Sequence, residues 1–262
     1  MVIAMTYTIV TKQDEYSIEL AEIMKRKINI PYDEKNPDIV ISIGGDGTIL
    51  KSLHSYADRA DDITIFSINT GHLGFITNFT VEEIDKVAEM INTGEFTTET
   101  VGLIDYEVKT TLDTFRGVAL NEVTCINPTR TLIVDVSVDS EELELFRGTG
   151  LCISSPFGST GYNKSLHGSV IDPALNCFQL TEIASINSRA YRTLSSPLLL
   201  SAGKVITIEN NESQDTWVTV DNTSYRLTNF KSLRVGYSNH SVKMAENNID
   251  FIGRLKKAFI NN

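Results

Sequence analysis

The first hundred residues alternate between short apolar runs and segments with apolar residues at helical spacing. Runs rich in β-branched residues predict strands at 7–10, 39–43 and 63–68. Apolar residues every three or four positions predict helices over 18–28 and 81–91, and Gly94 is placed to end the second one. Because strands and helices alternate, we expect a parallel sheet covered by helices.

From about residue 96 the pattern changes to short runs rich in Thr, Val, Ile and Tyr, separated by turn residues. These runs predict strands at 131–138, 205–209, 217–221 and 232–237. Two segments depart from this pattern. Residues 174–186 follow Asp172-Pro173 and could form a short helix, and apolar residues between 249 and 259 return to helical spacing.

The pattern therefore predicts two domains and a terminal helix. We expect an α/β domain with a parallel sheet over 1–97 and a β-rich, sandwich-like domain over 98–246. The helix within 247–262 is expected to pack back on the N-terminal domain.

Composition narrows the function. The 262 residues carry 23 Lys and Arg against 34 Asp and Glu, a net charge of −11, which argues against binding nucleic acid or an anionic membrane surface. Cys125, Cys152 and Cys177 lie in apolar stretches and are odd in number, as expected for reduced thiols in the cytoplasm. No apolar stretch approaches the ~20 residues of a membrane span, and the start lacks a signal-peptide pattern.

A glycine turn follows the second predicted strand, with the sequence Gly44-Gly45-Asp46-Gly47-Thr48. In a parallel sheet, ligands bind at the carboxyl ends of strands. Glycines allow positive φ angles and let backbone N–H groups approach a phosphate, although tight turns use glycine for structural reasons too. Asp46 would either activate a hydroxyl or help to hold a cation. The Lys-Ser/Thr pair of a Walker A loop is absent.

Three further segments could bind a ligand. Residues 69–75 form a second glycine-rich loop after a strand, so the two loops would line one crevice. Asn121-Glu122 interrupts an apolar run and is either a strand-end turn or a pair that binds ribose hydroxyls. Residues 146–165 collect glycines, hydroxyls and amides, as in a surface loop or a binding loop. The four histidines lack the spacing of metal ligands, so we expect no metal site built by the protein, and His72 is the best candidate for a non-structural role.

With these motifs in this order, the chain resembles bacterial NAD kinases over nearly its whole length. The resemblance is carried by 44–48, Gly71-His72-Leu73-Gly74-Phe75, Asn121-Glu122 and the segment from Thr160 to Ser165. The GGDGT element alone is shared with phosphofructokinases and with diacylglycerol and sphingosine kinases. A related lipid or sugar kinase therefore stays an alternative, as does an adenine-nucleotide sensor without turnover.

The resemblance implies transfer of the terminal phosphoryl group of ATP, or of polyphosphate, to the adenosine 2′-hydroxyl of NAD, which gives NADP. It also implies NAD bound between the two domains, and Mg²⁺ or another divalent cation carried with the phosphate donor. Proteins of this family are usually homodimers or homotetramers.

Residue by residue, Asp46 resembles the general base, while Gly44, Gly45, Gly47 and Thr48 resemble the donor loop. Asn121 and Glu122 match the pair that grips ribose and nicotinamide, and Ala184 and Ile186 match positions that reach a neighbouring subunit's ligand. The full substrate-binding set implied by the resemblance is Gly47, Phe75, Asn121, Glu122, Arg147, Thr149, Thr160, Gly161, Tyr162, Ser165, Ala184, Ile186 and Asp221.

Four positions depart from the family pattern. Thr149 stands where Asp is usual, Phe157 replaces a small polar residue, His167 replaces a glycine, and Asn222 replaces a histidine. All four lie in segments expected to face the ligand, so they bear on substrate specificity and rate.

Overall fold

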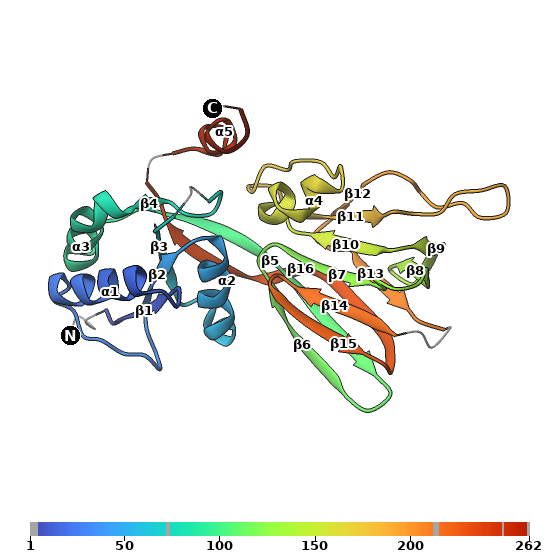
Figure 1. Ribbon diagram of the computed structural model, residues 1–262, viewed down its shortest axis with the longest axis horizontal. Helices are drawn as coiled ribbons and strands as arrows, with labels where there is room; N and C mark the ends of the chain where they lie inside the picture. The colour runs from blue at the N-terminus through green and yellow to red at the C-terminus, as the bar shows by residue number, and fades with distance from the viewer. Residues whose placement is uncertain (1–4, 72–73, 212–214, 248, 261–262) are drawn as a thin grey trace. The chain divides into compact units, whose positions relative to one another are not determined.

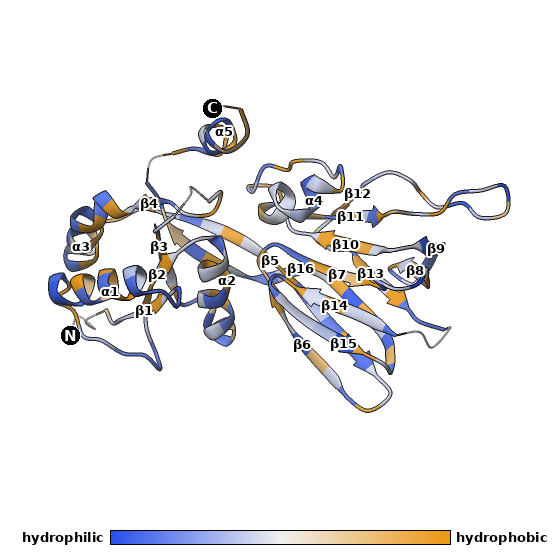
Figure 2. Ribbon diagram, in the orientation of Figure 1, coloured by the Kyte–Doolittle hydropathy of each residue, from blue (hydrophilic) through white to orange (hydrophobic). Residues whose placement is uncertain are grey.

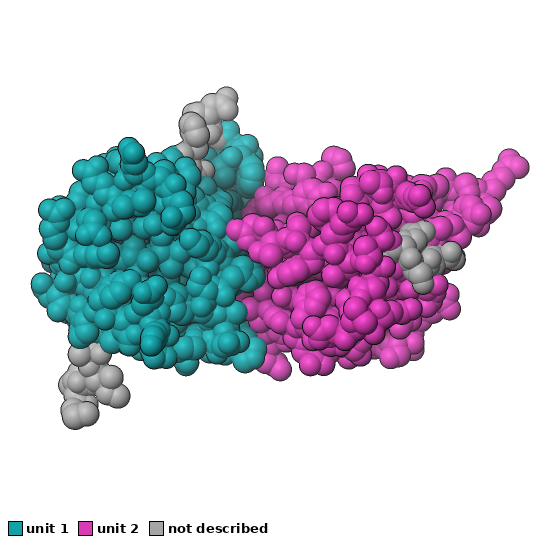
Figure 3. Space-filling view, turned by 60° about the horizontal axis from the view of Figure 1, so that its bottom comes forward, with its two compact units in different colours: residues 1–101, 240–262 teal, residues 102–239 magenta. Residues whose placement is uncertain are grey.

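The computed structural model describes residues 5–71, 74–211, 215–247 and 249–260 (Figure 1). The chain forms two compact units, coloured separately in Figure 3: residues 1–101 with 240–262, and residues 102–239. The chain crosses from one unit to the other within two long strands, β5 (Thr98–Thr110) and β16 (Phe230–Ala245).

The first unit contains the predicted parallel sheet. Its strands are β1 (Tyr7–Thr11), β2 (Ile39–Gly44), β3 (Thr64–Asn69) and the two-residue β4 (Phe79–Thr80). They run parallel in the order β1, β2, β3, and both β4 and the end of β16 pair with β3. Every residue of β2 and β3 is buried, which explains why these strands are rich in Ile, Val and Phe and lack a regular alternation of apolar and polar residues.

Three helices cover this sheet: α1 (Glu15–Lys27), α2 (Asp46–Ser55) and α3 (Ile84–Thr93). Short 3-10 turns lie at Ala57–Arg59 and Val81–Glu83. Asp14 caps α1 by accepting a 2.8 Å hydrogen bond from the backbone N–H of Ser17. Gly94 ends α3 at φ +71°, as the sequence predicts. The colouring of Figure 2 shows orange apolar residues alternating with blue polar ones along α1 and α3.

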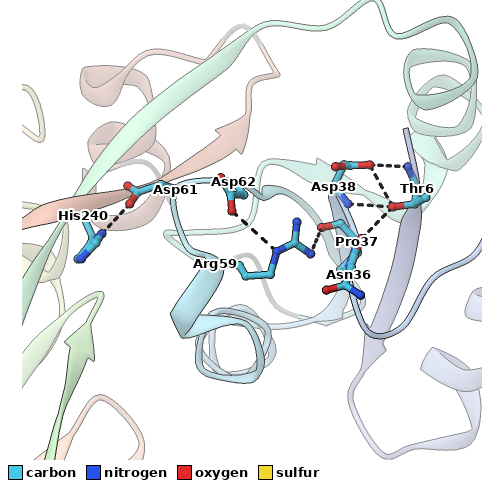
Figure 4. Close-up of polar contacts among 8 residues, drawn as sticks. All are labelled: Thr6, Asn36, Pro37, Asp38, Arg59, Asp61, Asp62 and His240. Atoms are coloured by element: carbon cyan, nitrogen blue, oxygen red, sulfur yellow. Dashed lines mark hydrogen bonds and ion pairs between the residues drawn. The ribbon is translucent and has the colours of Figure 1, made fainter. Parts of the chain in front are cut away.

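Hydrogen bonds at His240 and Ser241 hold the last strand, β16, at the point where it enters the first unit. His240 Nδ1 lies 2.6 Å from Asp61 Oδ2, and the backbone N–H of Ser241 donates to Asp61 Oδ1 at 2.8 Å (Figure 4). The same view shows Arg59 donating to the carbonyl of Pro37. The Asp61 contacts hold the loop before β3 against β16, whose end pairs with β3, and the Arg59 contact ties the same loop to the segment before β2.

The predicted C-terminal helix is present. It consists of α5 (Phe251–Leu255), which Asp250 caps, and a π-helical turn over Lys256–Ile260. Both belong to the first unit. No helix in the described ranges is long and apolar enough to cross a membrane.

The second unit is a β-sandwich, which confirms the predicted fold class. One antiparallel sheet has the order β12 (Leu198–Ser201), β11 (Cys177–Ile183), β10 (Gly150–Ser154), β7 (Glu122–Ile126), β14 (Thr216–Val220), β15 (Thr223–Leu227). The other joins β16 to β13 (Val205–Glu209), β8 (Leu132–Val138) and β9 (Glu141–Gly148), and to the hairpin of β5 with β6 (Thr114–Ala119). Phe146, Phe178 and Phe230 are fully buried in their shared core.

The expectation of a short helix within 174–186 is wrong, because this segment contains strand β11. β11 lies between β10 and β12, and all its residues but Glu182 are buried. A strand covered on both faces loses the alternation of apolar and polar residues, so its sequence is hard to distinguish from that of a buried helix.

Candidate active site

The glycine turn joins β2 to α2. Gly44 ends the strand at φ +157°, and a Cβ there would lie 2.1 Å from Thr48 Oγ1, so the turn requires glycine at this position. Gly45 is the N-cap of α2 at φ −101°. Of the described glycines, Gly44 and Gly94 have positive φ, so Gly45 and Gly47 do not use the positive φ that glycine allows. These two have open space instead, since a Cβ on either would meet no atom within 4 Å.

Asp46 is the first residue of α2, and its carboxylate connects the two glycine-rich loops. Oδ2 accepts a 3.0 Å hydrogen bond from the backbone N–H of Phe75, and Oδ1 accepts one of 3.1 Å from Ile76. A Cβ on Gly74 would lie 2.0 Å from Asp46 Oδ1. The structure thus brings together the two loops, as expected. His72 lies outside the described residues.

The environment of Asp46 suits a proton acceptor. Burial raises the pKa of its carboxyl, and the backbone N–H groups of Ile76, Phe75 and Thr77 lower it, with burial the larger effect. Main-chain donors also fix the direction of the carboxylate, because a backbone amide cannot rotate away as a side chain can. The result is an oriented base of increased basicity.

In the second unit, Asn121 and Glu122 lie at the turn from β6 to β7, where Asp221 orders the backbone. The Asp221 carboxylate accepts hydrogen bonds from the backbone N–H groups of Leu120, Asn121 and Glu122 at 3.0, 2.8 and 3.2 Å. Asp221 itself has φ +50° in the turn after β14. It therefore positions the Asn121-Glu122 pair through the main chain.

The side-chain carboxyl group of Glu122 is buried. Burial, and next the nearby Asp221 charge, raise its pKa from 4.5 to about 8. Within the described part of the chain, Glu122 Oε2 and Asn121 Oδ1 are buried and lack a hydrogen-bond partner. Since buried polar atoms are normally paired, these two oxygens are suited to a ligand that carries hydroxyl or amide donors.

The loop after β10 packs directly on this pair. Ser155 Oγ donates to the Leu120 carbonyl at 2.5 Å and accepts from the N–H of Gly158 at 2.9 Å. A Cβ on Gly158 would lie 2.1 Å from the Asn121 carbonyl oxygen, and one on Gly161 would lie 3.5 Å from Glu122 Oε2. The predicted binding loop and the predicted acceptor pair therefore form one site.

The side chains of this loop differ in exposure. Thr160 is buried and its hydroxyl donates to the carbonyl of Phe157 at 3.4 Å. Tyr162 and Ser165, at the two ends of the short helix α4 (Tyr162–Ser165), are exposed. The side chains of Tyr162 and Ser165 are thus accessible to a ligand, whereas the side chain of Thr160 is largely buried within the loop.

The sequence missed a residue that holds this loop together. Asn163 is fully buried and donates to the carbonyls of Ser159 and Ser169 at 3.2 and 3.3 Å. Its Oδ1 accepts a 2.7 Å hydrogen bond from Thr181 Oγ1 on β11. An asparagine among glycines and serines looks like an ordinary loop residue, and only the tertiary contacts show its role.

Four candidate residues lie at the other end of β10. Gly150 pairs with Ile183, whereas Ser154 pairs with Glu122, so the two ends are four residues, or about 13 Å, apart. The group near Gly150 consists of Arg147, Thr149, Ala184 and Ile186. The N–H of Ile186 donates to the Arg147 carbonyl at 2.7 Å, and a Cβ on Gly148 would lie 2.8 Å from the Ala184 carbonyl oxygen.

Arg147 makes one further contact that the sequence did not predict. Its guanidinium lies 4.3 Å from the centroid of the Tyr191 ring. Within a single chain, the structure does not bring the four residues near Gly150 to the Glu122 end of the strand.

The departures from the family pattern have distinct surroundings. His167 has φ +63°, a left-handed conformation that favours glycine. Phe157 is buried, whereas Asn222 is exposed. Among the residues that the structure describes, no group of three or more His, Cys, Asp or Glu side chains is arranged to hold a metal ion.

The raised pKa of Glu122 predicts a pH-dependent stability. Between about pH 4.5 and 8 the folded chain keeps a proton that the unfolded chain has released, so the free energy of unfolding falls as pH rises. Glu122→Gln should remove a slope of about 1.4 kcal/mol per pH unit, measured by urea denaturation across this range. Glu89→Gln, at an exposed site on α3, is the control. Equal slopes in wild type and Glu122→Gln would contradict the assignment.

Comparison with known proteins identifies the family of this chain. A family model described as the ATP-NAD kinase N-terminal domain matches residues 6–96, and one described as the ATP-NAD kinase C-terminal domain matches residues 120–246. A NAD kinase of Lactobacillus acidophilus is 39% identical over 243 residues, covering 92% of this chain and 90% of the relative. NAD kinase 1 of Listeria innocua is 37% identical, covering 98% of this chain and 99% of the relative.

Solved structures show the same fold. Yeast NADH kinase complexed with NADH aligns with a TM-score of 0.82 at 19% identity, covering 99% of this chain and 89% of that one. A NAD kinase from Archaeoglobus fulgidus in complex with ATP aligns with a TM-score of 0.74 at 24% identity, covering 97% of each chain. With family matches to both halves and relatives aligned over nearly their whole length, the chain belongs to the NAD kinase family.

Proposed function

We propose that this chain transfers the terminal phosphoryl group of ATP, or of polyphosphate, to the adenosine 2′-hydroxyl of NAD, giving NADP. The observation that carries the proposal is the Asp46 carboxylate, which sits at the glycine turn and is oriented by the amides of Phe75 and Ile76. The names of the relatives, NAD kinase and NADH kinase, support the choice of substrate.

Asp46 would act on the acceptor hydroxyl. A sugar hydroxyl is a weak nucleophile, and the carboxylate takes its proton as the new oxygen–phosphorus bond forms and the bond to the donor's bridging oxygen breaks. The N-terminus of α2 would face the donor phosphates, and the absence of side chains at Gly45 and Gly47 leaves space for them there. Mg²⁺ or another divalent cation, carried with the donor, would neutralise phosphate charge that this acidic chain does not offset.

Asn121 and Glu122 would bind the acceptor's ribose. With a pKa of about 8, the Glu122 carboxyl is mostly protonated at neutral pH, so it can both donate to and accept from a hydroxyl. The buried Asn121 Oδ1 adds an acceptor. A lipid kinase would need an apolar acceptor pocket here, so this polar pair favours a nucleotide. A nucleotide sensor would share the pair, and only turnover distinguishes it.

A homodimer or homotetramer would explain the second group of candidate residues. Arg147, Thr149, Ala184 and Ile186 lie about 13 Å along β10 from the Glu122 end. We propose that this group contacts a ligand bound by a neighbouring subunit.

We also propose a cytoplasmic location, which three buried free cysteines support.

Asp46→Asn should lower kcat by about two to four orders of magnitude, with the chain still folded and able to bind NAD, because the amide cannot take a proton and its NH2 group loses one of the two hydrogen bonds from Phe75 and Ile76. NADP formed from NAD, ATP and Mg²⁺ is measured with a coupled NADP-specific dehydrogenase. Asp85→Asn, an exposed carboxylate on α3, is the matched control. Wild-type kcat in Asp46→Asn would reject the base, and no NADP from the wild-type chain would favour the sensor.

Thr149→Asp combined with Asn222→His should lower KM for NAD. A hydrogen bond to a charged group is worth about 1.5–3 kcal/mol, which corresponds to roughly tenfold to hundredfold. The two single variants separate the contributions, since Thr149 precedes the Gly150 end of β10, whereas Asn222 follows Asp221, which contacts Glu122 opposite the Ser154 end. An unchanged or higher KM in the double variant would show that the two departures do not affect binding.

A further inference from the structure

The C-terminal segment of the first unit, here Asn247 and residues 249–260, packs on the loop that supplies the amides to Asp46. The Phe259 ring is stacked on the Phe75 ring, with centroids 5.9 Å apart and planes at 29°. Phe251 meets the same ring edge-on, with centroids 6.3 Å apart. Phe75 is also the residue whose N–H donates to Asp46 Oδ2. One residue thus connects the terminal segment with the candidate base.

A buried ion pair fixes the terminal helix. Arg254 Nη2 donates to both carboxylate oxygens of Glu99 at 2.9 and 2.7 Å, and the two side chains are only 11% and 19% exposed. Removing one partner of such a shielded ion pair is destabilising, because the other charge is left buried without a partner. The helix is therefore held by a contact on β5 that does not involve the loop.

Asn247 fastens the start of the segment to the far end of the loop. Its Nδ2 donates to the Asn78 carbonyl at 2.9 Å and to the Glu83 carboxylate at the same distance. In return Asn78 Nδ2 donates to the Ala245 carbonyl at 2.7 Å. The loop end at Asn78 is thereby fixed, whereas the part at Phe75 is held by the aromatic contacts and by the hydrogen bonds to Asp46.

The packing between the loop and the segment is incomplete. A cavity of about 260 Å³ is lined by residues of both, including Gly74, Phe75, Arg254 and Lys257. A loop beside such a space can shift into it when a contact is lost, so the rings of Phe251 and Phe259 restrain it against a real alternative.

We propose that the C-terminal segment is a positioning element of the active site: its aromatic rings hold Phe75 so that the amides of Phe75 and Ile76 stay on the Asp46 carboxylate. Its consequence for catalysis rests on the proposed function, while the positioning itself does not. Phe259 and Phe251 are positioning residues that act through Phe75.

The effect on protonation follows from the contacts of Asp46. The influences on its pKa are burial and the three backbone N–H groups of Phe75, Ile76 and Thr77. Hydrogen bonds depend more steeply on distance and angle than burial does, so a small shift of the loop weakens the amide contacts while the carboxylate stays out of bulk water. The pKa of Asp46 then rises, so the acid limb of the kcat profile shifts to higher pH.

Phe259→Ala tests the proposal in the full-length chain. Amide exchange at Phe75 and Ile76 should become about tenfold faster, and the pKa of Asp46, followed by carboxyl ¹³C NMR, should rise. Ile260→Ala removes a more exposed apolar side chain of the same turn and should change neither. Phe259→Tyr keeps the ring and should behave as wild type. Should Phe259→Ala fail to fold, Phe259→Leu keeps apolar bulk without the ring and takes its place.

The results separate this proposal from the proposed function. Unchanged amide exchange and an unchanged Asp46 pKa in the folded variant would overturn the positioning role. Both readouts are independent of turnover, so they decide the question even for a chain that makes no NADP. Loss of the base assignment would instead appear as full kcat in Asp46→Asn, with the exchange result unaffected.

Discussion

The two hydrogen bonds from the amides of Phe75 and Ile76 to the Asp46 carboxylate are the contacts on which the candidate active site of the first unit depends. They hold the glycine turn after β2 against the loop after β3. Gly74 carries no side chain because Asp46 Oδ1 occupies the place of its Cβ. The loop therefore has to keep this backbone arrangement, and the aromatic rings of the C-terminal segment contribute to that by contacting Phe75.

Three carboxyl groups illustrate how surroundings decide a role. Asp221 accepts three backbone N–H groups, so its charge serves to order the turn at Asn121 and Glu122. Glu122 is buried beside that charge, and its raised pKa keeps it protonated at neutral pH. Asp46 combines burial with amide donors, which leaves an oriented carboxylate. Residue type alone does not distinguish a structural anion, a hydrogen-bonding acid and a base.

The sequence predicted most of the fold, because helical spacing and apolar runs report burial directly. It identified α3 up to Gly94 and the turn at Asp46, where a local motif carries the information. It failed at β11, which is buried on both faces, and it missed Asn163, whose contacts come from distant segments. The sequence also does not determine which residues of neighbouring strands pair. The separation of Thr149 from Glu122 along β10 is therefore known only from the structure.

The contact between Gly74 and Asp46 allows the most direct measurement. A methyl group in Gly74→Ala would lie 2.0 Å from Asp46 Oδ1, so either the carboxylate or the loop must move, whereas the Cβ of Gly203→Ala, in the turn between β12 and β13, would meet no atom within 4 Å. We expect kcat for NADP formation to fall about a hundredfold or more in Gly74→Ala, with the protein still folded, and to change by no more than about twofold in Gly203→Ala. Equal kcat values in the two variants would contradict the account.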